Sequence, residues 1–272
     1  MTVKEPLLPD RHRQLDFFVC NVLDPRTKND LSSMEHPCFM LSTKLKREIF
    51  RYENNGCYIE IAPSAYGYAT QFDKDVLIFC LSHLVEGLNR GRTDVSRTVR
   101  FVAYDFLLFA NRQTSGDGYK RLQLALDRLK GTSIKTNVPT AGETIRRGFG
   151  IIDDYEIVER SPINNQMIAI EVTLSRWFFN AVCAHEVLTL SQDYFRLRKP
   201  LERRIYEIAR KHCGRQESWK VSLKMLHAKT GSTGLLKEFR RSIKQLHSSN
   251  HLPDYEVEFL SDEDLVLFQR RK

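Results

Sequence analysis

Three apolar residues of one segment recur in a second segment 117 positions later, and this repeat constrains the fold more than any other feature. Within each segment the three residues stand at i, i+4 and i+7, which places them on one face of a helix. The matching pairs are Leu122 with Phe239, Leu126 with Ile243, and Leu129 with Leu246. A neighbouring pair, Leu107 and Leu108, aligns with Met225 and Leu226 at an offset of 118. The chain therefore contains two copies of one structural unit.

The elements predicted around the repeated helices follow the same order in both halves of the chain. In the C-terminal half, Pro200 suits the first position of a helix and Ser222 suits the cap of another. The other elements predicted there are a strand at Trp219–Val221, a helix from Leu235 to about His247, and a hairpin of Tyr255–Leu260 and Leu265–Gln269. The N-terminal half has a helix capped by Asp73, short elements at Thr98–Val102 and Tyr104–Ala110, a helix at Tyr119–Lys130, and strands at Ser133–Val138 and Thr144–Ile152. This order is typical of a winged helix-turn-helix. We predict an α+β fold of two tandem winged helix-turn-helix domains related by an internal pseudo-repeat.

Three regions follow from this repeat. Residues 1–37 contain Pro6, Pro9, Pro25 and Pro37, and we expect a partly ordered N-terminal arm. Residues 38–190 are predicted to form an N-terminal winged-helix domain. Residues 191–272 are predicted to form a C-terminal winged-helix domain that is the main reader of DNA.

The positive charge of the chain is concentrated in two segments. Residues 199–250 contain 13 basic and 4 acidic residues, and residues 92–147 contain 11 basic and 5 acidic residues. These segments carry +9 and +6, which leaves −7 for the rest of a chain whose net charge is +8. Two basic segments in an acidic remainder favour two contact surfaces for a polyanion.

The helix that begins at Leu235 has the composition of a recognition helix, with an apolar inner stripe and a basic outer one. In a helix-turn-helix the second helix lies in the major groove. Arginine binds guanine through two hydrogen bonds, whereas lysine acts as a point charge beside phosphate. We therefore predict that Arg240 and Arg241 read bases and that Lys237 and Lys244 contact phosphates. A solvated basic helix without a partner is the alternative.

The first unit is a weaker candidate for base reading. Asp127 stands among the outward residues of its helix, and the apolar Leu124 lies on the face that would meet DNA, where it suits a protein contact. Arg146 and Arg147 fit either a wing on the DNA backbone or an exposed hairpin tip. The DNA-binding residues predicted besides those of the recognition helix are Arg203, Arg204, Lys120, Arg121, Arg128, Arg146 and Arg147.

Signals of catalysis and of membrane insertion are missing from the sequence. The longest apolar run, Val76–Leu81, has six residues, far short of the roughly 20 that span a bilayer. No glycine-rich phosphate loop is present, and the closest histidines, His247 and His251, do not belong to a cluster that would hold a metal. Six cysteines without a Cys-x-x-Cys pair and an N-terminus without a secretory signal favour reduced thiols in a cytoplasm. We predict no catalytic residue, no metal, no cofactor and no enzymatic activity. A DNA-nicking replicase is the rival from the enzyme class.

Four motifs resemble signatures of the bacterial plasmid replication initiator protein A family. They are Arg196–Gly214, Ser33–Pro37, Leu88–Arg92 and Gly148–Asp153, and the likeness extends from about Arg11 to Arg270. The resemblance implies a plasmid-encoded initiator that binds direct repeats in double-stranded origin DNA, promotes local melting, and recruits the host initiator and the replicative helicase. It also implies a monomer that starts replication and a dimer that represses, giving control of plasmid copy number. The N-terminal winged helix is the dimer surface in such initiators, so we expect residues 38–190 to dimerise, bind DNA, or do both. A dimeric winged-helix transcriptional repressor without initiator activity is the alternative.

Overall fold

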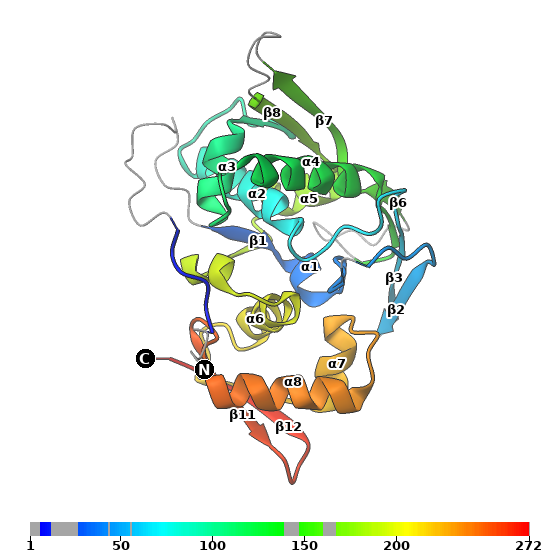
Figure 1. The fold of residues 1–272 in the computed structure, drawn as a ribbon, viewed down its shortest axis with the longest axis vertical. Coiled ribbons are helices and arrows are strands. Elements are labelled where there is room, and N and C mark those ends of the chain that lie inside the picture. Colours follow the sequence, from blue (N-terminus) through cyan, green and yellow to red (C-terminus); the bar gives the residue numbers. More distant parts are fainter. Residues whose placement is uncertain are drawn as a thin grey trace.

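A computed structural model describes residues 6–11, 27–42, 44–54, 56–138, 147–159 and 167–271 of the chain. The C-terminal unit occupies the lower end of the molecule and the N-terminal unit the upper end, and α6, the first helix of the C-terminal unit, lies where the two meet (Figure 1). In this view α4 and α8, the repeated helices, run nearly parallel to each other. Among the described residues, no helix is long and apolar enough to cross a membrane.

The C-terminal unit has the predicted elements with small shifts at their ends. They are α6 (Pro200–His212), β10 (Ser218–Ser222), α7 (Leu223–Thr230), α8 (Leu236–Ser249), β11 (Tyr255–Leu260) and β12 (Leu265–Arg270). Pro200 stands in the first turn of α6, and the Ser222 hydroxyl accepts the Met225 N–H at 3.2 Å. Gly231, with φ of +69°, ends α7 in the left-handed conformation that glycine adopts without steric cost. The strand order of the sheet is β10-β12-β11.

The N-terminal unit repeats this order of elements and of strands. Its elements are α2 (Lys74–Asn89), β4 (Thr98–Phe101), α3 (Ala103–Phe109), α4 (Gly116–Gly131), β7 (Ile152–Glu159) and β8 (Met167–Leu174). The strand order is β4-β8-β7, so the short first strand pairs with the last strand of the hairpin in both units. A helix, α5 (Arg176–Cys183), then follows β8.

The residues that carried the sequence repeat lie in the core. The six side chains that are 117 positions apart are all buried, with exposures of 3% or less. The offset of 118 for the neighbouring helix was wrong, because Met225 is exposed whereas Leu226 and Leu107 are buried. The caps of α3 and α7, Val102 and Ser222, are 120 residues apart. At this offset the buried Ala103 and Phe106 match the buried Leu223 and Leu226.

The strands predicted after α4 form a hairpin in a different sheet. β5 (Ser133–Thr136) and β6 (Arg147–Gly150) join β2 (Phe50–Asn54) and β3 (Cys57–Ala62) in the order β2-β3-β5-β6. The strand predicted at Thr144–Ile152 is present as β6 over Arg147–Gly150, but its predicted end at Ile152 already belongs to β7 in the other sheet. The counterpart of the C-terminal hairpin is β7 with β8, which the sequence pattern did not identify. Four of the eight residues of β7 are acidic, and acidic residues are depleted in strands.

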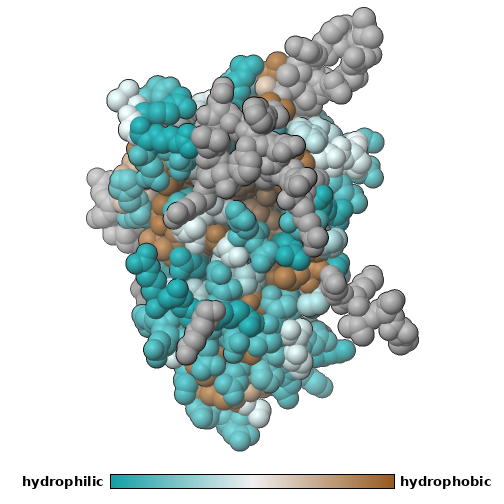
Figure 2. Space-filling view, turned by 90° about the vertical axis from the view of Figure 1, so that its left-hand side faces the viewer, coloured by the Kyte–Doolittle hydropathy of each residue, from teal (hydrophilic) through white to brown (hydrophobic). Residues whose placement is uncertain are grey.

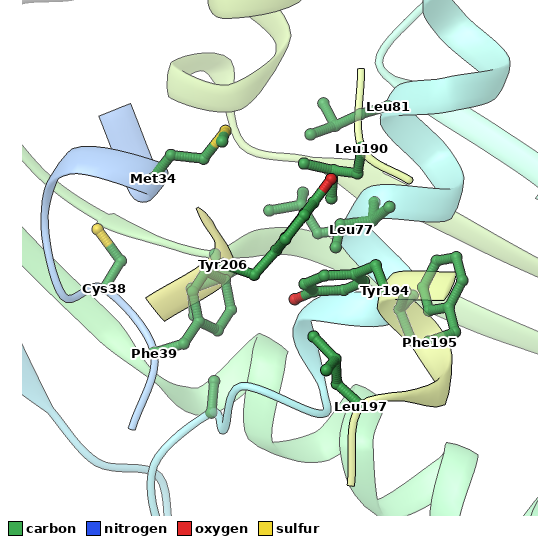
Figure 3. Close-up of a cluster of buried hydrophobic side chains, with 14 of the residues drawn as sticks. Met34, Cys38, Phe39, Leu77, Leu81, Leu190, Tyr194, Phe195, Leu197 and Tyr206 are labelled. Atoms are coloured by element: carbon green, nitrogen blue, oxygen red, sulfur yellow. The ribbon is translucent and has the colours of Figure 1, made fainter. Parts of the chain in front are cut away.

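The described part of the expected N-terminal arm belongs to the folded body. β1 (Lys28–Asp30) pairs with β9 (Val187–Thr189), and α1 (Leu31–Glu35) packs against α6. Asn29, Asp30 and Met34 are fully buried. Ten labelled side chains from α1 and the residues after it, α2, residues 190–197 and α6 point toward one another (Figure 3). An apolar core therefore joins the two units, and it includes the short 3-10 helix η1 (Gln192–Arg196).

Candidate nucleic-acid interface

Helix α8 presents one polar and basic stripe to solvent. Its apolar side is formed by the three buried residues of the repeat, so the helix can rest on the unit by only one face. Lys237, Arg241 and Lys244 are exposed on the opposite face, and none forms an ion pair within the described part of the chain. Gln245 and Ser248 extend this stripe, since they follow Arg241 by four and seven residues. Sequence reasoning missed these two residues, although helical spacing from Arg241 locates them.

The structure separates the two arginines that were predicted to read bases. The Arg240 guanidinium binds the Asp264 carboxylate in the turn between β11 and β12, with Nη2 to Oδ1 and Oδ2 distances of 3.0 and 2.9 Å. Its side chain is 37% exposed, whereas Arg241 is exposed and has no carboxylate partner in the described chain. Arg241 is therefore the stronger candidate for a bidentate contact with a base. Arg240 instead connects the helix to the hairpin.

The hairpin beside α8 has an acidic tip. Asp262, Glu263 and Asp264 form the turn between β11 and β12. Three carboxylates would repel DNA phosphates, so this tip is unsuited to grip the backbone. Farther along the same hairpin, the Lys244 ammonium lies 5.7 Å from the centre of the Phe259 ring, which holds it by a cation–π interaction.

Arg203 and Arg204 were wrongly assigned to DNA binding, because both are buried with exposures of 1%. Arg203 Nη1 binds both oxygens of Asp75 of α2 at 2.7 and 2.9 Å. Arg204 donates to the carbonyl oxygens of Ser33 and Met34 at 2.8 and 2.9 Å and to that of Lys229 at 2.9 Å. These two arginines stabilise the contact between the N-terminal and C-terminal units.

A buried carboxylate, Glu207 of α6, completes this contact. It accepts from Lys74 Nζ of α2 at 2.9 Å, from Gln71 Nε2 at 2.6 Å and from the Tyr194 hydroxyl at 2.8 Å. Both Lys74 and Glu207 have fully buried side chains. Burial and the negative charge of Glu207 raise the pKa of Tyr194 well above its ordinary value. We refer to this buried polar contact between α2, α6 and η1 as the inter-unit network.

Helix α4 of the N-terminal unit has fewer exposed, unpaired cations than α8 among the described residues. Lys120 and Arg121 are exposed without an ion pair in the described residues. The Arg128 guanidinium binds the Asp73 carboxylate through two hydrogen bonds of 2.7 Å, so its assignment as a DNA contact was wrong. The hydrogen bonds to Asp73 and the negative charge of that carboxylate hold the pKa of Arg128 above its ordinary value, although burial acts in the opposite direction.

Asp127 and Leu124 of α4 differ in their environment. The Asp127 carboxylate accepts a hydrogen bond from the Tyr155 hydroxyl of β7 at 2.6 Å, so this side chain contacts the sheet as well as solvent. That hydrogen bond, together with burial, raises the pKa of Tyr155 to about 12. Leu124 is 43% exposed, as predicted. Arg146 lies outside the described residues, and the backbone of Arg147 begins β6, where it pairs with Thr136 of β5.

The histidines that stand closest in the sequence have partners within the protein. His247 Nδ1 lies 3.0 Å from the Val257 carbonyl oxygen, and His251 Nε2 lies 3.3 Å from the Glu202 carboxylate. In the part of the chain that the structure describes, no three ligand-type side chains gather as a metal site. The surface that faces the viewer in Figure 2 is mostly hydrophilic, with small hydrophobic patches between the polar regions.

Known proteins of similar sequence or structure match nearly the whole chain. A "Putative replication protein" of Wigglesworthia glossinidia brevipalpis is 39% identical over 270 residues, which cover 98% of each chain. A crystal structure of domains 2 and 3 of RctB matches with a TM-score of 0.61 at 12% identity, covering 88% of this chain and 96% of that one. A second RctB structure of the same domains gives a TM-score of 0.58 at 12% identity, with coverages of 86% and 95%. Both structural matches show a shared mixed α/β fold. The family model of replication initiator protein A matches residues 28–257. The chain therefore belongs to the replication initiator protein A family.

Proposed function

We propose that the protein is a plasmid DNA replication initiator that binds direct repeats in double-stranded origin DNA through two tandem winged helix-turn-helix domains. The observation that carries this proposal is the exposed stripe of α8, whose cations lack carboxylate partners in the described chain. Such a stripe on the second helix of a helix-turn-helix suits the major groove. Membership of a replication initiator family then favours an origin over other DNA.

Each residue of the stripe suits a specific kind of contact. Arg241 suits guanine and Gln245 suits adenine, because each can form two hydrogen bonds with the major-groove edge of that base. Lys237 and Lys244 provide point charges for the flanking phosphates. We propose that Lys120 and Arg121 of α4 place the N-terminal domain, residues 38–190, on adjoining DNA.

We propose that the contact between the units fixes the distance between their DNA-binding surfaces. The inter-unit network and the apolar core of Figure 3 oppose any rotation of α2 against α6. If both units meet one face of the duplex, their contacts should lie about 10–10.5 bp apart. Binding energy can then offset a DNA deformation that costs about 1–6 kcal/mol, and this deformation would help to melt the neighbouring A·T-rich DNA. The protein needs no catalytic residue for such an action.

Self-association and host partners complete the proposal. Leu124 and the 57% exposed Tyr66 give the N-terminal unit apolar surface that suits a second copy of the chain. We propose that the monomer initiates replication in the cytoplasm, where it recruits the host initiator and the replicative helicase. The dimer would repress and so limit plasmid copy number.

Footprinting of the plasmid origin over a range of protein concentrations tests the proposal. We expect protected repeats, each covering two adjoining groove segments per molecule. Protection of one short segment per molecule would contradict the paired binding mode. A transcriptional repressor would give the same footprint but would not support replication of an origin-bearing plasmid in cells. A nicking enzyme would convert supercoiled plasmid to a relaxed or covalently attached product with Mg²⁺, and we expect neither product.

A further inference from the structure

A basic loop of the N-terminal part of the chain lies beside the turn that precedes α8. We call residues 44–49, which stand between Met40 and β2, the basic loop. Residues of this loop and of Gly231–Gly234 line one groove of about 470 Å³. In Figure 1 the lower end of β2 reaches the connection between α7 and α8. The loop therefore flanks the surface proposed for DNA binding, although it is distant in sequence.

The cations of the basic loop are free. Lys44, Lys46 and Arg47 are exposed, and none of them forms an ion pair with another described residue. Glu48 is the one carboxylate in residues 44–49, so the loop carries a net charge of +2. Many other basic side chains of the protein are neutralised, as Arg128 is by Asp73. Unpaired cations close together favour a polyanion as the partner.

The backbone of the basic loop is held in place. The Tyr68 hydroxyl donates to the Glu48 carbonyl oxygen, and the Lys44 N–H donates to the Ser42 hydroxyl at 3.2 Å. A side-chain carbon at Gly67 would lie 3.4 Å from Leu45, so this part of the chain packs closely on the loop. A loop that is already ordered loses less entropy when it binds a ligand.

The turn before α8 is held against the same region. A side-chain carbon at Gly231 would come within 2.5 Å of Pro37 and within 3.6 Å of the Phe50 ring. The turn therefore packs directly on the segment that carries the loop. Ser232 and Thr233 of the turn line the same groove as Lys44 and Lys46. Hydroxyl groups and lysines are the donors that proteins commonly use to bind DNA phosphates.

We propose that the basic loop and the turn before α8 form a clamp for the DNA backbone. This inference rests on the proposed function, because it places the phosphates of one strand in the groove while α8 occupies the major groove. It adds a DNA contact from the N-terminal part of the chain to the C-terminal unit. The contact acts on phosphates, so it raises affinity for every sequence alike and leaves the preference for the repeat unchanged.

The test compares two triple variants of the full chain. Lys44→Ala/Lys46→Ala/Arg47→Ala removes the unpaired cations of the loop. Arg90→Ala/Arg92→Ala/Arg100→Ala removes the same charge from cations that pair with Glu86, Asp94 and Glu171. Binding to a labelled mixed-sequence duplex and to a duplex with the footprinted repeat is measured by fluorescence anisotropy over a range of KCl concentrations.

Loss of three phosphate contacts should lower the steepness of log K against log salt by about 2.7 for both duplexes. When the salt concentration rises from about 50 to about 200 mM, both proteins lose affinity, and the loss for the loop variant should be about 40-fold smaller than the loss for wild type. The control variant should keep the wild-type slope, as should Lys44→Arg/Lys46→Arg. Thermal unfolding of the loop variant checks that it is folded, and if it is not, the same slopes are measured for Lys46→Glu alone, which should lower the slope by about 0.9.

Three outcomes overturn the clamp. If the folded loop variant keeps the wild-type slope while wild type binds the repeat, the clamp fails and the proposed function stands. If the two triple variants lose slope equally, the effect comes from net charge and the clamp fails. If wild type binds neither duplex, the clamp and the proposed function fail together. An unchanged slope would leave the exposed Leu45 and Ile49 as a site for a protein partner.

Discussion

Replacing Glu207 with glutamine should weaken the contact between the two units more than any surface change would. Glu207 is fully buried, and its carboxylate balances the buried Lys74 ammonium at 2.9 Å and Arg204 at 3.3 Å. Glutamine has nearly the same shape but no charge, so the variant leaves buried cations without compensation. Breaking a buried ion pair in this way costs about 3–5 kcal/mol. Domains are commonly stable by only about 5–15 kcal/mol, so we expect a large loss of stability.

The two tryptophans of the chain provide the assay. Trp177 of α5 belongs to the N-terminal unit and Trp219 of β10 to the C-terminal unit, and each packs on another aromatic ring. Variants that retain one tryptophan report the urea unfolding of each unit by fluorescence. With Glu207 present we expect coincident transitions, because the network and the shared core couple the units. Glu207→Gln should lower the free energy of unfolding by about 3–5 kcal/mol and separate the two midpoints.

A surface variant provides the control for this measurement. Glu86→Gln removes a carboxylate from an exposed pair with Arg90, whose oxygen–nitrogen distance is 2.7 Å. Such an i, i+4 pair contributes about 0.3–0.5 kcal/mol, so this variant should unfold almost like wild type. A loss below about 1 kcal/mol for Glu207→Gln, with coincident midpoints, would refute the role of the network.

Three further predictions concern pH, DNA reading and self-association. Burial lowers the pKa of His36 from 6.5 to about 4, so the unfolded chain binds its proton first as the pH falls. The contribution of neutral His36 to the free energy of unfolding is therefore fully present above about pH 6.5 and is lost as the pH falls toward 4. Urea titrations should show that the free energy of unfolding of His36→Gln falls less steeply over this pH range than that of wild type. Arg241→Ala should cost about 1–3 kcal/mol of DNA-binding free energy and relax the preference at one base pair. Arg240→Ala should cost less, because the Arg240 guanidinium already has an acidic partner, and equal losses for the two variants on a panel of site variants would contradict this difference. Leu124→Glu should shift the protein from dimer toward monomer in sedimentation runs while leaving binding to a single repeat intact, and an unchanged dimer would remove Leu124 from the interface.

The sequence alone determined the features that depend on local periodicity. Leu122, Leu126 and Leu129 and their three counterparts had to lie on one helix face, because helical spacing is a property of neighbouring residues. The start of α6 at Pro200 and the cap at Ser222 were predicted for the same reason. The stripe of cations on α8 followed from its apolar face, since residues on the opposite side of an amphipathic helix meet solvent.

Only the tertiary structure decided which cations are free to bind DNA. Arg204 and Arg241 look alike in the sequence, yet one lies among carbonyl groups of α1 and α7 and the other is exposed. Arg128 and Arg240 are held by Asp73 and Asp264, which are 55 and 24 residues away. A charge can be buried only when partners from distant segments compensate it, and no local pattern encodes those partners. For the same reason the sequence pattern could not show that residues 44–49 lie beside the turn before α8, because contacts with Pro37, Phe50 and Gly231 bring them together.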